Sequence, residues 1–138
     1  MSDPRYHMVE GAPRPVAPFS HAVEADGWVM LTGQMPTDPA DPDAPLPEGV
    51  ALQTARVMAN LELVLRGLGL DRRHILQCRC YLTDFEGDYA AFNAAYEAFF
   101  AGRPLPARTT VGVTGLAVGA LVEVDCLARR PASGEGAG

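Results

Sequence analysis

Two stretches with helical periodicity, separated by one strand-like stretch, constrain the fold of this chain most strongly. Mostly aliphatic side chains recur every three or four residues from 50 to 68, which places them along one side of an α-helix. Phenylalanine and tyrosine recur in the same way from 85 to 99, and we interpret this aromatic stripe as core rather than as a cage for a ligand. Residues 75–82, between the two, are typical of a strand. The middle of the chain is therefore helix, strand, helix.

Short motifs mark the ends of both helices. Gly67 and Gly69 close the first stripe, where glycine commonly ends a helix. Thr83 with Glu86 three residues later has the pattern of a capping box, which predicts a second helix that runs through Phe100.

Strands are expected on either side of this unit. Asp26-Gly27 is a turn signal between two strand-like segments and predicts a hairpin. The expected strands cover residues 6–9, 20–25, 28–32, 75–82, 109–113 and 121–128. The order ββ(β)αβαββ predicts an α+β fold, a mixed six-stranded sheet with two helices on one face.

Several of these strands are hydrophobic on both faces. Trp28 and Met30 point to one side of their strand, and Val29 and Leu31 point to the other. The last strand has Leu121 and Leu127 opposite Val122, Val124 and Cys126. Because two helices cover only one face of a sheet, the other face must be buried against something that one chain does not supply. We therefore expect an oligomer.

Size and charge bound the organisation and the partners. At 138 residues the chain is long enough for one core and too short for two. We expect a single domain over residues 1–130 and a disordered tail over 131–138, with the first residues to about 5 also disordered. Seventeen acidic residues against eleven basic ones give a net charge of −6, and lysine and arginine form no cluster. A nucleic-acid partner is therefore not expected.

The cysteines and the N-terminus indicate a compartment. Cys78, Cys80 and Cys126 are an odd number within strand-like segments, which favours buried structural thiols over metal or redox use. The N-terminus has no charged-then-hydrophobic signal segment, and no hydrophobic run approaches the ~18 residues of a membrane span. We therefore expect a cytoplasmic protein without a membrane partner.

Arg108 and Glu123 are the candidate functional pair. Pro106 cannot donate a backbone hydrogen bond, so strand pairing should begin after it and leave Arg108 at the open end of a strand. Glu123 lies between Val122 and Val124, in a segment with little other reason to carry a charge. A guanidinium binds a carboxylate through two parallel hydrogen bonds, and a partly desolvated glutamate can transfer a proton. The pair suggests a cofactor-free site for a substrate that bears a carboxylate.

Both residues also have simpler interpretations. Arg108 could be a surface arginine or part of an interface ion pair, and Glu123 could face water beside Asp125. If the last two strands form a plain hairpin, a change of one residue in its register decides whether Arg108 and Glu123 share a face. The sequence does not fix that register.

Other chemistries are poorly represented. The serines stand in no nucleophile motif, and no histidine has a carboxylate at the spacing of a known catalytic motif. Asp38, Asp41 and Asp43 lie in the proline-rich loop 36–47 without the glycine and closing glutamate of a calcium loop. No metal-spaced set of histidine and cysteine, phosphate loop or dinucleotide fingerprint occurs. We expect neither a metal nor a cofactor.

Several blocks of this sequence together resemble the RidA/YjgF/UK114 family of reactive-intermediate imine deaminases. The most specific are Pro106-Ala107-Arg108 followed by Val122-Glu123-Val124, with supporting matches at Thr32-Gly33-Gln34-Met35-Pro36 and over residues 93–100. The resemblance covers roughly residues 15–129. It implies a chorismate-mutase-like fold assembled as a homotrimer. The three clefts between subunits would cover the open sheet face and could include residues of a second subunit.

The resemblance also implies an activity and a role for each matching residue. Active members hydrolyse enamines and imines, such as 2-aminoacrylate and 2-iminobutyrate, to 2-oxo acids and ammonia. By resemblance, Arg108 would hold the substrate carboxylate, and Glu123 would orient or deprotonate the attacking water. Thr32, Gly33 and Asn93 would line the pocket and contact substrate or water.

Two positions in the expected pocket depart from the family pattern. Phe19 stands where many deaminases have tyrosine, although RutC-like relatives also have phenylalanine there, and Thr110 stands where many deaminases have cysteine. Both are expected to contact the substrate. One alternative to a deaminase is a regulatory trimer that binds a 2-oxo acid without turnover. Another is an endoribonuclease or translation inhibitor, against which the acidic balance of the chain argues.

Overall fold

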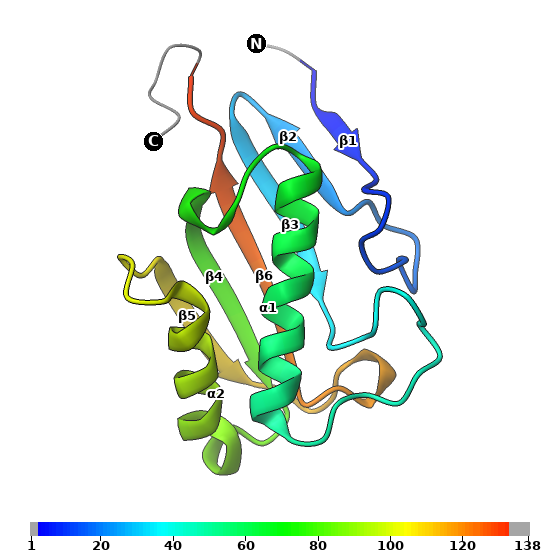
Figure 1. The fold of residues 1–138 in the computed structure, drawn as a ribbon, viewed down its shortest axis with the longest axis vertical. Helices are drawn as coiled ribbons and strands as arrows, with labels where there is room; N and C mark the ends of the chain where they lie inside the picture. The colour runs from blue at the N-terminus through cyan, green and yellow to red at the C-terminus, as the bar shows by residue number, and fades with distance from the viewer. Residues whose placement is uncertain (1–2, 133–138) are drawn as a thin grey trace.

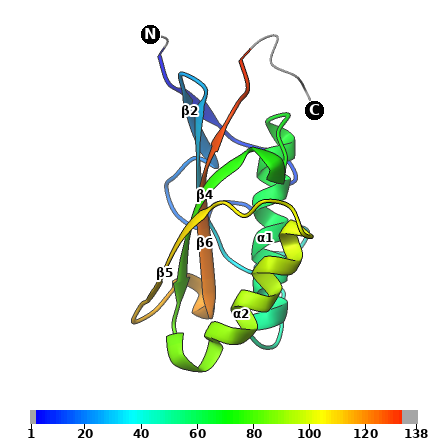
Figure 2. The same cartoon turned by 90° about the vertical axis from the view of Figure 1, so that its left-hand side faces the viewer.

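A six-stranded mixed sheet carries both helices on one face in the computed structural model, which describes residues 3–132 (Figure 1). The strands are β1 (Arg5–His7), β2 (Ala22–Ala25), β3 (Trp28–Gln34), β4 (Ile75–Leu82), β5 (Ala107–Gly112) and β6 (Val122–Arg129). The helices are α1 (Val50–Gly67) and α2 (Phe85–Phe100), with 3-10 turns at Arg72–His74 and Ala117–Gly119. In the side view, α1 and α2 both lie on the same side of the sheet (Figure 2). The α+β fold expected from the sequence is confirmed.

The order of the strands across the sheet is β1-β2-β3-β6-β4-β5. The last strand in the sequence, β6, therefore lies in the middle, antiparallel to both β3 and β4. The edge strand β5 pairs in parallel with β4, and α2 makes the crossover that a parallel pair requires. The last two strands thus do not form a hairpin, because β4 separates them.

The hydrophobic core lies between the two helices and the sheet. Leu61 of α1 and Phe92 of α2 are fully buried, and they belong to one cluster with the inward-facing residues of β3, β4 and β6. The three cysteines are buried in it as free thiols. Burial raises the pKa of Cys78 to about 11 and that of Cys80 to about 12. Both therefore stay protonated at neutral pH and pack as small hydrophobic groups.

Some element boundaries differ from expectation. Asp84, rather than Thr83, caps α2, and its Oδ1 accepts a hydrogen bond from the Gly87 backbone N–H at 3.1 Å. Aspartate and threonine are both good N-caps, so two neighbouring candidates could not be separated by residue type. Arg5, expected to be disordered, begins β1, and its guanidinium lies 2.9 Å from a Glu24 carboxylate oxygen. Within the expected tail, residues 133–138 lie outside the described residues, as do residues 1–2 at the N-terminus.

The face of the sheet opposite the helices is uncovered. Trp28 and Met30 point to this face and are 46% and 48% exposed, whereas their neighbours Val29 and Leu31 are buried. The expected division of the strands into two hydrophobic faces is therefore confirmed, and the oligomer that would cover the open face stays a prediction. Neither helix in residues 3–132 is long and hydrophobic enough to cross a membrane.

Candidate functional site

Arg108 lies on the helix side of β5, against α2. Its guanidinium carbon is 5.8 Å from the ring centre of Tyr89, 5.3 Å from that of Phe92 and 5.0 Å from that of Tyr96. These three rings recur at helical spacing, so they share one face of α2. Nη2 of Arg108 also donates a hydrogen bond of 3.2 Å to the Tyr89 hydroxyl. Aromatic faces attract a cation without neutralising it, which leaves the charge of Arg108 available.

No carboxylate among the described residues neutralises this guanidinium. Across residues 3–132, Arg108 forms no ion pair, and its hydrogen bond to Tyr89 uses one of its five N–H donors. A cavity of about 370 Å³ opens beside it. The cavity is lined by Asn93, Ala94, Tyr96, Glu97, Leu105, Pro106 and Arg108. An unpaired cation at a cavity is a suitable site for an anionic group.

Asn93 and Tyr96, which line this cavity, and Thr110, two positions along β5 from Arg108, each carry a buried oxygen without a regular partner. Oδ1 of Asn93, the hydroxyl of Tyr96 and Oγ1 of Thr110 are buried and have no hydrogen-bond partner of normal geometry. The two hydroxyls reach only the weakly accepting thiols of Cys78 and Cys80. Because buried polar atoms are ordinarily hydrogen-bonded, the unpartnered oxygens of Asn93 and Tyr96, two residues of the cavity lining, favour a polar ligand here.

Glu123 lies on the other face of the sheet, half-buried on β6 and opposite Tyr81 of β4. The pairing of β3 with β6 shifts register between Leu31 and Gln34, and Gly33 lies in this irregular stretch. The Glu123 carboxylate packs directly on Gly33, since a Cβ built there would lie 2.0 Å from Oε2. Only glycine leaves room for the carboxylate in this position. Thr32, next to Gly33 on β3, is half-buried.

The surroundings of Glu123 suit proton transfer. Burial raises the pKa of its carboxyl above the ordinary value of 4.5, and the negative charge of Asp125 raises it further. Asp125 itself is held in place by Arg79, whose Nε donates to Oδ1 at 2.9 Å, and by Tyr81, whose hydroxyl donates to Oδ2 at 3.0 Å. A carboxylate with a raised pKa is a better proton acceptor near neutral pH.

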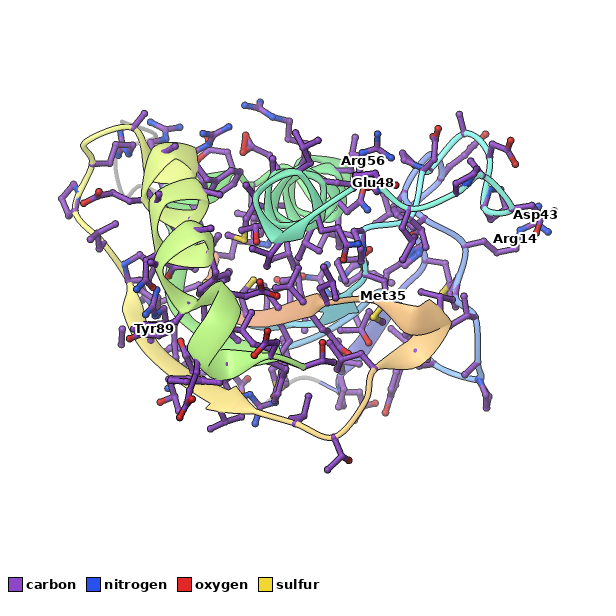
Figure 3. All side chains as sticks on the ribbon, turned by 90° about the horizontal axis from the view of Figure 1, so that it is seen from below. Arg14, Met35, Asp43, Glu48, Arg56 and Tyr89 are labelled. Atoms are coloured by element: carbon purple, nitrogen blue, oxygen red, sulfur yellow. The ribbon has the colours of Figure 1, made fainter. Side chains whose placement is uncertain are left out.

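The expected site residues thus fall into two groups. The arginine group consists of Asn93, Arg108 and Thr110, and the glutamate group consists of Phe19, Thr32, Gly33 and Glu123. Phe19 and Gly33 line one shallow pocket together with Arg14 and Met35. In the view from below, Tyr89 of α2 lies next to β5 on one side of the molecule, and Met35 and Arg14 lie towards the other side (Figure 3).

The structure of one chain does not bring the two groups together. Arg108 of β5 pairs with Cys78 of β4, and Glu123 of β6 pairs with Tyr81, three residues further along β4. Cys78 points into the core, whereas Tyr81 points to the open face. Arg108 and Glu123 therefore lie on opposite faces of the sheet, with β4 between their strands.

The chain matches known proteins over nearly its whole length. Residues 9–130 match the family model described as Endoribonuclease L-PSP. The chain belongs to this family, the RidA/YjgF/UK114 family that the sequence motifs resemble. It is 44% identical over 119 residues to protein DfrA of Myxococcus xanthus, covering 85% of this chain and 88% of that protein.

Two further relatives have names that refer to a ligand or a reaction. The mouse 2-iminobutanoate/2-iminopropanoate deaminase is 31% identical over 117 residues, covering 85% of this chain and 84% of that protein. The crystal structure of Escherichia coli TdcF with bound serine has a TM-score of 0.83 and 26% identity, covering 91% of this chain and 99% of that one.

The sequence did not predict that the aromatic residues of α2 surround Arg108, because their stripe was interpreted as core alone. Phe92 and Tyr96 are buried, as the interpretation of the stripe as core requires, but Tyr89 is 36% exposed. The available signal was a helical stripe made only of aromatic residues, shortly before the strand that carries Arg108. In the described part of the chain, no group of three or more His, Cys, Asp or Glu is placed to hold a metal ion.

Proposed function

We propose that this chain is a hydrolytic deaminase that converts reactive enamines and imines into 2-oxo acids and ammonia without a cofactor. The observation that carries the proposal is the Arg108 guanidinium, which has no ion-pair partner among residues 3–132 and lies at a cavity whose lining includes Asn93 and Tyr96. Family membership supports it, because one relative is named for the deamination of 2-iminobutanoate and 2-iminopropanoate. Both compounds bear a carboxylate next to the C=N carbon, the feature that an arginine fork binds.

Each active site in this proposal combines two subunits. One chain holds Arg108 and Glu123 on opposite faces, so a complete site needs the arginine group of one subunit and the glutamate group of another. Head-to-tail contacts join two different surfaces of identical subunits and close into a ring. A homotrimer, the assembly typical of the family, would provide three such sites. It would also bury the uncovered face that carries Trp28 and Met30.

The proposed mechanism begins after the enamine tautomerises to its imine. Arg108 binds the carboxylate and so turns the adjacent C2 towards a water molecule. Glu123 accepts a proton from that water as its oxygen attacks C2, and the C=N bond becomes a C–N single bond. Glu123 returns this proton to the nitrogen, which gives the carbinolamine; the hydroxyl proton then moves to the nitrogen as the C–N bond breaks, and ammonia and the 2-oxo acid leave. Thr32, Gly33 and the other members of the two groups contact substrate and water.

Arg108→Ala tests the assignment of the carboxylate-binding residue. Imines are generated in the cuvette from several amino acids by an amino-acid oxidase, and ammonia release is followed with and without the protein. We expect the variant to lose the acceleration while it keeps its oligomeric state in solution. Equal clearance of the imine by variant and wild type would disprove the role of Arg108. Binding of a 2-oxo acid by calorimetry without turnover would instead identify a non-catalytic binding protein.

Mixing two inactive variants tests whether the site is shared between subunits. Arg108→Ala and Glu123→Gln chains are co-refolded in equal amounts, so that neighbours in the ring are random. A site is intact when its glutamate comes from the first variant and its arginine from the second, which predicts about one quarter of wild-type activity. Each variant refolded alone should stay inactive. A mixture without activity would mean that no site combines the arginine of one chain with the glutamate of another.

A further inference from the structure

Tyr89 is the polar contact of the Arg108 guanidinium in the described ranges. A guanidinium has no acceptor, so the 3.2 Å contact is a hydrogen bond from Nη2 to the phenol oxygen. Tyr89 lies on α2 next to β5 (Figure 3), the edge strand in which Arg108 is the second residue. The hydrogen bond therefore adds a directional contact to the aromatic packing around the guanidinium.

Tyr89 itself is held in place. Its ring stacks on that of Phe85, with centres 4.7 Å apart and planes 23° from parallel. Both rings are 36% exposed, so they form the solvent side of the aromatic surroundings of Arg108. The inner side consists of Phe92 and Tyr96, which are buried and cannot move aside. Removing the hydroxyl of Tyr89 would leave these rings in place and release the guanidinium alone.

We propose that Tyr89 is a positioning residue for carboxylate binding: it engages one Nη2 hydrogen and orders the guanidinium so that its remaining donors face the cavity. The inference rests on the proposed function of the Arg108 site, which it deepens. An arginine loses side-chain conformational entropy when it is fixed on a ligand. If the site already orders the arginine before binding, the entropy lost on binding is smaller. Tyr89 thus favours ligands that need the whole fork, 2-imino and 2-oxo acids, over neutral amides of the same shape.

The test is a double-mutant cycle on direct binding, measured by calorimetry with 2-oxobutanoate and with its neutral amide. We expect Tyr89→Phe to weaken binding of the acid about three- to tenfold and binding of the amide by less than about twofold. In an Arg108→Lys background, where no planar fork is present to be oriented, the same change should have less than about a twofold effect on the acid. In steady-state assays Tyr89→Phe should raise KM and leave kcat nearly unchanged.

Tyr6→Phe is the matched control. Tyr6 lies on β1, at the opposite edge of the sheet, and is 70% exposed, so its variant should bind the acid as wild type does. Equal weakening for acid and amide, or equal effects of Tyr89→Phe in both backgrounds, would reduce Tyr89 to a structural residue and overturn the inference.

The Arg108→Ala variant, measured by the same calorimetry outside the cycle, separates the two proposals. Unchanged binding of the acid by Arg108→Ala would overturn both the proposed site and the role of Tyr89. Loss of binding in Arg108→Ala, together with unchanged binding in Tyr89→Phe, would overturn the role of Tyr89 alone.

Discussion

Gly33→Ala should displace the proposed catalytic carboxylate with little effect on the fold. A Cβ on residue 33 would meet only the Glu123 side chain among its three nearest neighbours, and it would lie 2.0 Å from Oε2. Ordinary contact begins near 3.4 Å, so the carboxylate must retreat by about 1.4 Å. A displacement of about 1 Å at a reacting group can lower the rate about 100-fold, and we expect a loss of this size in kcat.

The same geometry predicts which properties of the Gly33→Ala protein stay unchanged. The obstructing atoms are the flexible end of a half-buried side chain, so we expect the free energy of unfolding to change by less than about 1 kcal/mol. KM should change less than kcat, because in the proposed shared site the substrate carboxylate is bound by Arg108 of a neighbouring subunit and not by the displaced Glu123.

The assay is imine hydrolysis under saturating substrate, paired with thermal unfolding. Gly115→Ala is the control, because a Cβ at that position has no other atom within 4 Å. Its kcat should match the wild type. A Gly33→Ala protein whose kcat stays within about twofold of wild type would refute the reasoning that the carboxylate position limits the rate.

Two further predictions concern charge. In the wild type, activity should fall as the pH drops through the raised pKa of Glu123, because only the ionised carboxylate accepts a proton. Asp125→Asn removes a neighbouring negative charge and so lowers the pKa of Glu123. The acid limb of the kcat/KM profile should therefore move to lower pH. A hydrogen bond from Arg130 lowers the pKa of the buried Glu24 from 4.5 to about 2. The ionised Glu24 therefore stabilises the fold above pH 4.5, and this contribution is lost as the pH falls from 4.5 to about 2. Glu24→Gln should therefore lower the free energy of unfolding by about 2 to 3 kcal/mol at pH 7 in urea titrations, and the gap to wild type should narrow as pH falls.

Local patterns were sufficient to predict most of the elements. The aliphatic stripe over 50–68 corresponds to α1, and the strand expected over 75–82 has the bounds of β4. Alternation along β3 and β6 correctly assigned the side chains to the core or the open face. Each of these properties depends on a repeat of two or 3.6 residues, which the sequence contains directly. The cap of α2 was misplaced by one residue, because Thr83 and Asp84 both suit the position.

The pairing of strands that are distant in sequence could not be predicted in the same way. Nothing near residues 122–129 indicates that β6 inserts between β3 and β4, because that choice depends on which long-range contacts bury the most surface. The faces of Arg108 and Glu123 follow from this topology, as does the separation of β5 from β6. The aromatic surroundings of Arg108 depend on the same topology, because α2 lies against β5 only when β5 pairs in parallel with β4 at the edge of the sheet.

The opposite placement of Arg108 and Glu123 has a chemical advantage if they act on one substrate. Side by side on one chain, the guanidinium would pair with the carboxylate and occupy the donors that a substrate needs. It would also lower the pKa of Glu123, whereas a base that works near neutral pH needs that pKa raised. On separate faces, Arg108 is surrounded by uncharged rings and Glu123 by burial and a second negative charge. In the proposed shared site each group would thus keep its own reactivity until assembly, and the substrate carboxylate, rather than Glu123, would be the partner of Arg108.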